Sequence, residues 1–151
     1  MPAVRFRTIL ARFPVKAAAR MMTETSAKTT PRPEIAIVDD DPAVCGSLKF
    51  SLELEGFVVR TYYSGAEFTT ANNLEGCACF VIDQSLPDTN GVQLIEGLRA
   101  RHIEAPAILI VGNPYARLIA QAAAAGVAIV EKPLFGNALL MKIKEACKIV
   151  N

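Results

Sequence analysis

Short apolar runs alternate with amphipathic stretches from Glu34 to the end of the chain. An apolar run of four or five residues between polar or turn residues is typical of a buried parallel strand. We expect strands at 35–39, 57–61, 79–83, 107–111 and 127–131. Helical spacing of apolar residues predicts helices at about 42–55, 64–73, 90–101, 114–125 and 135–149. Five strand–helix units predict one α/β domain, a five-stranded parallel sheet with helices on both faces.

Residues that favour helix N-termini stand at several of these boundaries. Asp41 and Asn113 each precede a proline, and both are expected to be N-caps with the proline in the first helical position. Ser64 and Glu67 have the spacing of a capping box, in which the serine bonds forward and the glutamate reaches back.

Charged residues follow three of the predicted strands. Asp39 and Asp40 end the first, Asp83 ends the third, and Lys132 follows the fifth. The carboxyl ends of parallel strands meet at one edge of the sheet, where ligands bind. Two carboxylates about 4 Å apart repel by roughly 4 kcal/mol at an effective dielectric of about 20, so the cluster requires a cation. Oxygen ligands suit Mg²⁺.

Such a cluster also suggests a reaction. A carboxylate beside Mg²⁺ can attack phosphorus, and the metal and Lys132 can stabilise the charge on the transferred oxygens. The alternative is a set of solvated loop acids, which the convergence of three strand ends disfavours. Asp41 is expected to act only as an N-cap. The single histidine, His102, is expected at an exposed helix end without a metal or phosphohistidine role.

Length and composition limit the class of protein. At 151 residues and 52% hydrophobic, the chain can form one domain with a sizeable core. No apolar stretch approaches the roughly 18 residues of a membrane span, so no membrane association is expected. The four cysteines lack zinc-finger spacing, and Cys77-x-Cys79 runs into a predicted strand. Buried, reduced thiols and a cytoplasmic location are therefore expected.

The charge is distributed unevenly. Residues 1–33 contain seven basic residues and one acidic residue, a net charge of +6, whereas 34–151 contain nine basic and fourteen acidic residues, a net charge of −5. An Arg-rich, acid-poor leader resembles an organellar transit peptide, and basic leaders also bind nucleic acid or anionic lipid. A third interpretation is an upstream start codon, with Met21 or Met22 as the start and a disordered tail before it. The leader therefore carries no functional inference.

Three motifs together resemble one known family. They are Ile-Val-Asp39-Asp40-Asp41-Pro, Asp83-Gln-Ser-Leu-Pro-Asp-Thr-Asn-Gly, and Glu-Lys132-Pro. In this order and spacing they resemble the receiver domain of response regulators in two-component signalling, over residues 34–150. The sequence around the first motif is most similar to that of receivers from nitrogen-fixation regulators. The resemblance implies a flavodoxin-like doubly wound fold with strand order 2-1-3-4-5.

The resemblance also implies a role for each matching residue. Asp83 matches the phosphoacceptor, Asp39 and Asp40 match the acidic metal pair, and the backbone carbonyl of Ser85 matches the third protein ligand of Mg²⁺. Lys132 matches the lysine that binds the phosphoryl group.

Three further positions match the family's loops. Pro87 and Gly91 correspond to the loop that shapes the acceptor site, and the peptide bond before Pro133 is cis in the family.

Two positions depart from the family pattern. Val111 stands where the family has Thr or Ser, and Ile129 stands where it has Tyr or Phe. The segment 126–132 is also one residue shorter than usual. A hydrogen bond to a charged group contributes about 1.5–3 kcal/mol, a substantial share of the roughly 5.5 kcal/mol that moves a switch from 1:99 to 99:1. We expect the chemistry at Asp83 to survive and the usual conformational response to be lost.

Function is then expected to run through protein contacts. No DNA-binding or enzymatic segment follows the core in these 151 residues, and the acidic core disfavours direct DNA binding. We expect a single-domain response regulator, 34–151, that receives phosphate from a sensor histidine kinase. It is not expected to be an enzyme beyond its own phosphotransfer and slow autodephosphorylation. Further partners are a histidine phosphotransfer protein or a downstream regulator.

The fourth helix, expected to include Tyr115–Ala125, contains Arg117 as its single charged residue and ends in four alanines. With the fifth strand and fifth helix, it forms a possible homodimer face. The other interpretation is a well-packed helix of ordinary propensity.

Two alternative functions stay open. One is a pseudo-receiver that binds its partner whether or not Asp83 is phosphorylated. The other is a Mg²⁺-dependent phosphatase of the haloacid-dehalogenase type, with Asp39-x-Asp41 as nucleophile and acid. The second leaves Asp83 and Lys132 without a role.

Overall fold

The computed structural model describes residues 31–134 and 136–148, so the basic leader up to residue 30 lies outside the described residues. The sheet contains β1 (Glu34–Val38), β2 (Val58–Tyr62), β3 (Cys79–Asp83), β4 (Ala107–Val111) and β5 (Ala128–Glu131). All strand pairs are parallel, and the order is β2-β1-β3-β4-β5. The predicted fold class and strand order are confirmed.

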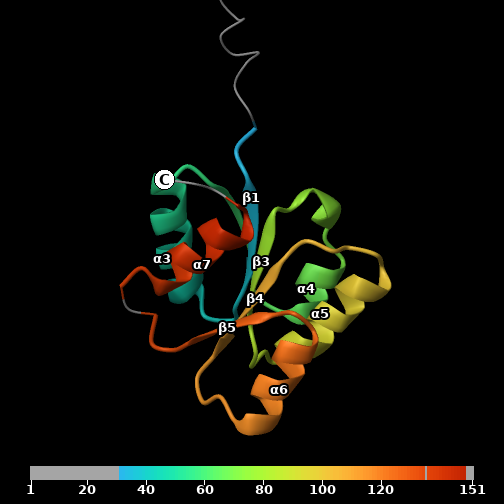
Figure 1. Ribbon diagram of the computed structural model, residues 1–151. Coiled ribbons are helices and arrows are strands. Elements are labelled where there is room, and N and C mark those ends of the chain that lie inside the picture. Colours follow the sequence, from blue (N-terminus) through green and yellow to red (C-terminus); the bar gives the residue numbers. More distant parts are fainter. Residues whose placement is uncertain (1–30, 135, 149–151) are drawn as a thin grey trace, which may run out of the picture. The chain divides into compact units, whose positions relative to one another are not determined.

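Helices cover both faces of the sheet (Figure 1). One face carries α3 (Pro42–Leu54) and α7 (Ala138–Ala146), and the other carries α4 (Gly65–Thr69), α5 (Gly91–Ala100) and α6 (Ala116–Ala124). A short 3₁₀ turn, Leu74–Gly76, precedes β3. Every residue of β3 and β4 is buried, because central strands of a doubly wound sheet meet helices on both sides. This is why these runs are apolar without alternation.

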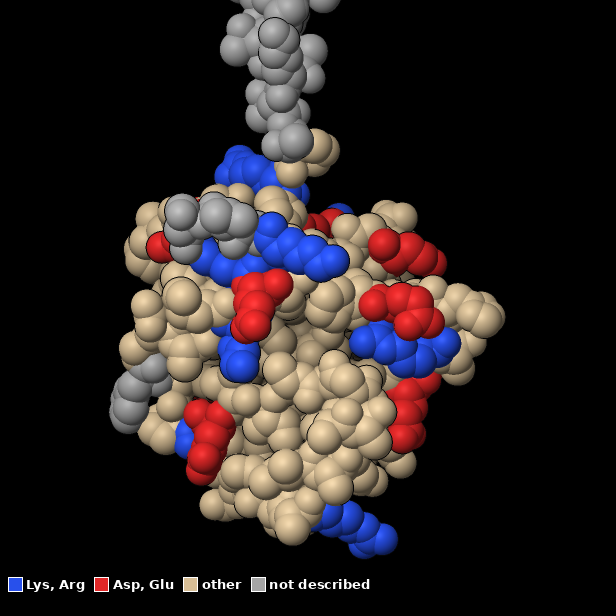
Figure 2. All heavy atoms as spheres, viewed as in Figure 1, with Lys and Arg blue, Asp and Glu red and all other residues tan. Residues whose placement is uncertain are grey.

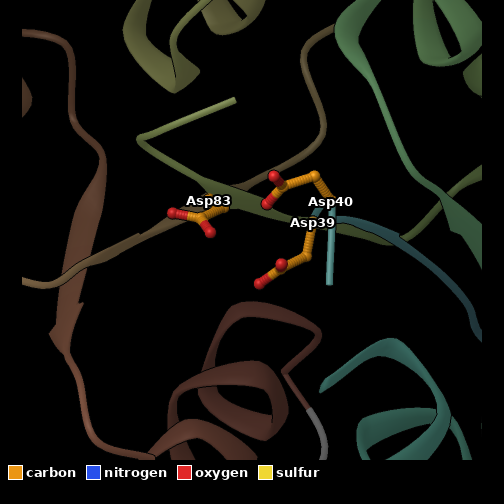
Figure 3. Close-up of side chains that lie close together, drawn as sticks. All are labelled: Asp39, Asp40 and Asp83. Atoms are coloured by element: carbon orange, nitrogen blue, oxygen red, sulfur yellow. The ribbon is translucent and has the colours of Figure 1, made fainter. Parts of the chain in front are cut away.

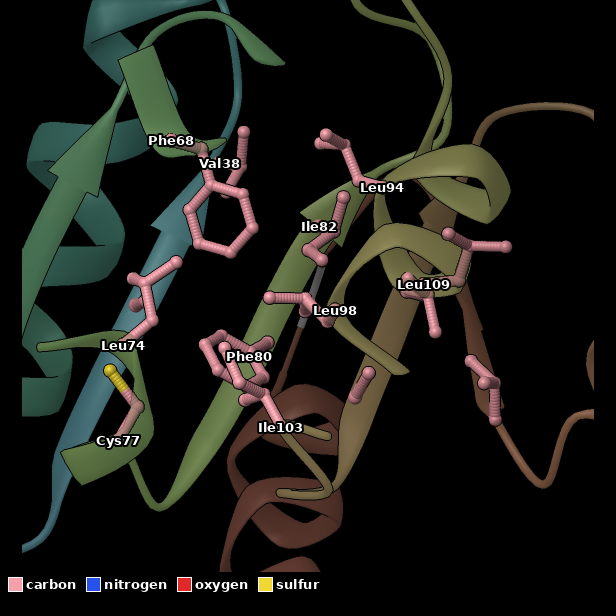
Figure 4. Packing of buried hydrophobic residues seen from close by; sticks show 14 of the residues in the cluster. Val38, Phe68, Leu74, Cys77, Phe80, Ile82, Leu94, Leu98, Ile103 and Leu109 are labelled. Atoms are coloured by element: carbon pink, nitrogen blue, oxygen red, sulfur yellow. The ribbon is translucent and has the colours of Figure 1, made fainter. Parts of the chain in front are cut away.

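Aromatic side chains organise the larger of the two cores. Phe68 of α4 packs edge-to-face against Tyr62 of β2 and Phe80 of β3, with ring centroids 5.4 and 5.7 Å apart. Figure 4 shows Phe68 and Phe80 among the apolar residues of β1, β3 and α5. Edge-to-face pairs of this kind contribute about 0.5–1.5 kcal/mol beyond the area they bury. The aromatic group therefore fixes α4 against the β1–β3 part of the sheet.

The second helix is shorter than the 64–73 that the sequence predicts, because α4 ends at Thr69. Ser64 caps it as expected, accepting a hydrogen bond from the Glu67 N–H, while Glu67 reaches back to the Tyr63 N–H instead of to the cap. The hydroxyl groups of Thr69 and Thr70 bond to the Ala66 carbonyl within the last turn. Such bonds compete with helix continuation.

The fourth helix also begins later than predicted. Asn113 was expected as the N-cap with Pro114 in the helix, but the N-cap is Tyr115 and it makes no side-chain capping bond. A residue before proline is biased toward extended backbone, and here the proline stays in the loop as well. The fifth helix begins at Ala138 rather than at 135, since Gly136 adopts a φ of 68° in the preceding turn. Phe135 and the predicted end at 149 lie outside the described residues.

Among the described residues, no helix combines the length and apolarity of a bilayer-spanning segment.

The aromatic core gives the first prediction. Phe80 is fully buried, so Phe80→Ala should lower the free energy of unfolding by about 3–5 kcal/mol through lost burial and a residual cavity. Phe50 is 67% exposed on α3, and Phe50→Ala should change stability by less than about 0.5 kcal/mol. Urea denaturation of both variants measures the difference. Equal losses would contradict this account of the core.

Candidate functional site

Strand register brings the charged residues together at one edge of the sheet. Val38 pairs with Ile82, so Asp39 and Asp83 follow on adjacent strands. Val111 of β4 pairs with Glu131 of β5, which places Lys132 at the same edge. The convergence that the sequence predicts for Asp39, Asp83 and Lys132 is therefore a consequence of the parallel register.

Three carboxylates form the centre of the site (Figure 3). One oxygen of each of Asp39, Asp40 and Asp83 lies within 4.8 Å of the others. Asp39 and Asp83 are each only 4% exposed, whereas Asp40 is exposed at the rim. Figure 3 shows the three side chains close together at the ends of two adjacent strands. Two of the three carboxylates are thus largely removed from water.

Hydrogen bonds hold the buried pair in place. The Asp41 N–H donates to Asp39 Oδ1 at 2.9 Å, and the Ser85 N–H donates to Asp83 Oδ1 at 3.1 Å. The ammonium of Lys132 donates to the other oxygen of Asp83, Oδ2, at 2.9 Å. Asp83 therefore has one oxygen bound to its own loop and the other bound to the ammonium of the residue that follows β5.

Burial and neighbouring charges both shift the pKa values of the site residues. Burial raises the pKa of Asp39 to about 6, and the neighbouring Asp83 carboxylate adds to the rise, while the Asp41 N–H and Lys132 oppose it. For Lys132, partial burial lowers the pKa, but the hydrogen bond and charge of Asp83, with Asp39 and Asp40, outweigh it and the pKa is raised. The lysine therefore stays charged.

The donor set fits a small divalent cation that prefers oxygen. The three carboxylates offer oxygen ligands only, and no Cys or His joins this cluster among the described residues. Mg²⁺ is bound in proteins through one or two carboxylates with waters and phosphate oxygens. A cation here would also offset the repulsion from Asp83, which adds to the effect of burial on the pKa of Asp39. Asp39, Asp40 and Asp83 are therefore suited to hold Mg²⁺.

Asp41 lies outside the carboxylate cluster. Its side chain accepts a hydrogen bond from the Ala43 N–H at 2.9 Å and caps α3, with Pro42 in the first turn. The predicted N-cap role is confirmed. A phosphatase that uses Asp39 and Asp41 as nucleophile and acid would need this side chain free, so the geometry disfavours that alternative.

The loop after Asp83 is packed tightly. A Cβ on Gly91 would collide with the Leu109 side chain and approach the Asp83 carbonyl to 3.1 Å, so a larger residue would require both to shift. Ser85 forms a bridge with Asn90 across the loop, and Asn90 caps α5 by accepting from the Gln93 N–H. Pro87 lies exposed at the turn of this loop.

Two loop residues have roles that sequence reasoning missed. Gln84 Oε1 accepts a hydrogen bond from the Val92 N–H and ties the loop to α5. Asp88 accepts from the Gly65 and Ala66 N–H groups at 2.9 and 2.8 Å, and these bonds lower its pKa. Asp88 lies more than twenty residues from the helix start that it caps, so no local sequence pattern predicts this role. From the sequence alone, Asp88 is only a polar residue of a loop.

Val111 and Ile129 are the two positions that the sequence predicts to depart from the family pattern. Val111 is 3% exposed at the end of β4, and its carbonyl accepts from the Lys132 N–H at 2.8 Å. Ile129 is partly buried against the core on the α5–α6 side. The peptide bond between Lys132 and Pro133 is cis. His102 is exposed with a φ of 63° after the end of α5 and is distant in sequence from every site residue.

Comparisons with known proteins agree on one family. The model of the response regulator receiver domain matches residues 35–144. The transcriptional regulatory protein FixJ of Azorhizobium caulinodans is 32% identical over 111 residues, which are 73% of this chain and 53% of that protein. The C4-dicarboxylate transport transcriptional regulatory protein DctD of Pseudomonas aeruginosa is 29% identical over 77% of this chain and 25% of its own length.

A solved structure gives the same result for the fold. The CheY-like receiver domain protein of Methanospirillum hungatei superimposes with a TM-score of 0.72 at 30% identity, covering 78% of this chain and 95% of that one. The present chain thus spans a quarter to about half of the curated relatives, and nearly all of a receiver domain of known structure.

The raised pKa of Asp39 predicts a pH-dependent stability. Between pH 3.8 and about 6, the unfolded state ionises Asp39 while the folded state keeps it protonated. Raising the pH through this window therefore lowers stability. In EDTA at pH 7.5, Asp39→Asn should raise the free energy of unfolding by about 2–3 kcal/mol, because the amide keeps the acceptor for the Asp41 N–H without the charge.

The gain should be nearly lost at pH 3.5, where Asp39 is protonated in the folded wild type and mostly protonated in the unfolded one. Asp41→Asn is the matched control, since it makes the same chemical change at an exposed helix cap and asparagine also caps well. Thermal unfolding of the three proteins at both pH values measures the effect. An Asp39→Asn gain that is equal at pH 3.5 and 7.5 would rule out this electrostatic origin.

Proposed function

The chain belongs to the response regulator receiver domain family, and on this premise we propose that it accepts a phosphoryl group on Asp83. The observation that carries the proposal is the environment of this carboxylate. Asp83 is buried, its Oδ2 lies 2.9 Å from the Lys132 ammonium, and the Asp39 and Asp40 oxygens lie within 4.8 Å. A phosphodonor that reaches this edge meets a carboxylate nucleophile and a fixed positive charge together.

The transfer is a substitution at phosphorus. A carboxylate oxygen of Asp83 forms a bond to phosphorus while the donor's P–N bond, in phosphohistidine, or P–O bond, in an acyl phosphate, breaks with its electron pair. The Lys132 ammonium, already within hydrogen-bond distance, moves its donor to a phosphoryl oxygen as charge develops there. The Ser85 N–H continues to donate to Asp83 Oδ1 and so orients the carboxylate.

We propose that Mg²⁺ is bound by Asp39, Asp40, Asp83 and the backbone carbonyl of Ser85. When bound, the ion supplies positive charge to the transferring phosphoryl oxygens. Asp39 and Asp40 themselves bind and orient it, and the Asp41 N–H keeps Asp39 in position. Water later hydrolyses the acyl phosphate slowly, so the domain is a signalling phosphoacceptor rather than an enzyme with a turned-over substrate.

The response to phosphorylation is proposed to be weaker than is usual in the family. Val111 has nearly the shape of threonine but no hydroxyl to donate to the phosphoryl group, and Ile129 has no polar tip to reorient. The apolar character of both positions also supports a second candidate function, a binding module that contacts its partner regardless of phosphorylation. The experiments below separate the two.

Partners are proposed to be proteins. A sensor histidine kinase in the cytoplasm is the expected phosphodonor, with a histidine phosphotransfer protein or a downstream regulator as a further partner. In the view of Figure 2, few charged side chains lie on the lower part of the surface, over β5 and α6. Tyr115, the N-cap of α6, and Ile119, within α6, are 55% and 50% exposed, which supports the α6–β5–α7 face as the homodimer surface. Direct DNA binding is not proposed for the acidic core.

Phosphorylation is tested directly with acetyl phosphate. The wild type should be labelled with Mg²⁺ and lose at least nine-tenths of the label in EDTA. Asp83→Asn should abolish labelling, and Lys132→Ala should reduce it at least tenfold because the transferring oxygens lose a fixed charge. Asp41→Asn should be labelled as the wild type, since this residue caps α3. Label that persists in Asp83→Asn, or none in the wild type with Mg²⁺, would refute an acceptor role for Asp83 and leave the binding-module alternative.

The role of Val111 is tested by restoring the hydroxyl. In Val111→Thr, phosphorylation should change amide chemical shifts from β4 through α6, because the new hydrogen bond contributes about 1.5–3 kcal/mol. In the wild type the changes should stay within the loops that carry Asp39, Asp83 and Lys132. Val111→Ala, which adds no donor, is the control. Wild-type changes that already extend through α6 would show that the hydroxyl is dispensable.

A further inference from the structure

Two thiols lie against each other on the α3–α7 side of the sheet. Cys79 begins β3 and is fully buried, while Cys147 caps the end of α7 and is half-buried. Both belong to the apolar cluster beneath these helices, and a hydrogen bond joins their side chains. All four cysteines of the chain lie within the described residues, and all are free thiols.

We propose that Cys79 and Cys147 are a peroxide-sensitive pair that forms an intramolecular disulfide between β3 and α7. The two side chains share one apolar cluster and interact with each other, so the crosslink would join neighbouring groups. This site is separate from the carboxylate cluster. Cys79 stands at the opposite end of β3 from Asp83.

The positions of the two thiols assign their roles. The hydrogen bond from Cys79 lowers the pKa of Cys147, more than partial burial raises it. The same bond, together with deeper burial, raises the pKa of Cys79. Because the thiolate is the nucleophile, Cys147 is both the more accessible sulfur and the more reactive one. Cys79 is placed to resolve the product.

The reaction balances with hydrogen peroxide as the oxidant. The Cys147 thiolate attacks one peroxide oxygen, an S–O bond forms and the O–O bond breaks, and hydroxide leaves and takes up a proton as water. The Cys79 sulfur then attacks the Cys147 sulfenic acid, the S–S bond forms, the S–O bond breaks, and a second water carries away the thiol proton. Two thiols lose two hydrogens, and one peroxide becomes two waters.

The other two cysteines are poorly placed to compete. Cys45 donates its thiol to the Asp39 carbonyl at 3.3 Å, and Cys77 belongs to the cluster on the opposite face of the sheet. Burial raises the pKa of each to about 11. They are therefore matched controls of the same residue type in the same domain.

Oxidation would tie the end of α7 to the start of the central strand. Lys132 lies between β5 and α7, so the crosslink restrains the segment that follows the lysine without touching the carboxylates. Joining residues far apart in sequence restricts the unfolded chain, and the oxidised protein should therefore melt at a higher temperature.

The full chain is treated with hydrogen peroxide, alkylated with N-ethylmaleimide under denaturing conditions, and analysed by intact mass. The expected product has lost two hydrogens, takes up two fewer alkyl groups than the reduced protein, and reverts with dithiothreitol. Tryptic digestion should join the peptide of Cys147 to the long peptide of Cys79. Because that peptide also holds Cys77, the experiment is repeated in Cys77→Ala, where the crosslink should persist.

Cys147→Ala and Cys79→Ala should each abolish the crosslink, and Cys45→Ala should keep it. Cys147 is the more informative position, since its half-buried cap site tolerates alanine with little effect on folding. Peroxide should raise the melting temperature of the wild type but not of Cys147→Ala. The proposal is overturned if Cys147 oxidises to sulfinic acid without a crosslink, if Cys77 replaces Cys79 in it, or if the melting temperature rises equally without Cys147.

Discussion

The ion pair between Lys132 and Asp83 is the interaction on which the site depends, and the parallel register makes it possible. It joins β5 to the central strand across β4, with Nζ and Oδ2 2.9 Å apart. Asp39 arrives beside Asp83 because β1 and β3 are in register, and burial, with a smaller contribution from Asp83, raises the pKa of Asp39 to about 6. The sheet thus brings three carboxylates and one lysine together where strands end. A divalent cation would relieve the repulsion among the carboxylates.

The surrounding loops hold these charged side chains in fixed positions. Backbone N–H groups of Asp41 and Ser85 hold the two buried carboxylates, and Gly91 lets the loop after Asp83 approach Leu109 closely. Asp88 ties the same loop to the start of α4, which the aromatic core fixes against the sheet. Hydrogen bonds therefore anchor the acceptor loop to the starts of α4 and α5, while the Val111 side chain offers no polar contact toward α6.

Sequence reasoning reached the sheet and the meeting of Asp39, Asp83 and Lys132, because apolar runs mark buried strands and strand ends share an edge. The strand order came from the family resemblance. The predicted helix ends were wrong where side-chain hydrogen bonds or a proline compete with helix propensity, because the spacing of apolar residues does not reveal these effects. Thr69 and Thr70 end α4 early through their hydroxyls, and Pro114 stays outside α6. The Asp88 cap and the interaction between Cys79 and Cys147 depend on tertiary packing between distant segments, so no sequence motif predicts them.

The most direct test of the central claim is to locate the modified atom. After reaction with acetyl phosphate and Mg²⁺, borohydride reduces an aspartyl phosphate to homoserine, and peptide sequencing by mass spectrometry reads the position. The account predicts homoserine at position 83 alone, dependent on Mg²⁺. Homoserine at Asp39 or Asp40, or an unmodified Asp83 in a protein that binds Mg²⁺, would contradict it.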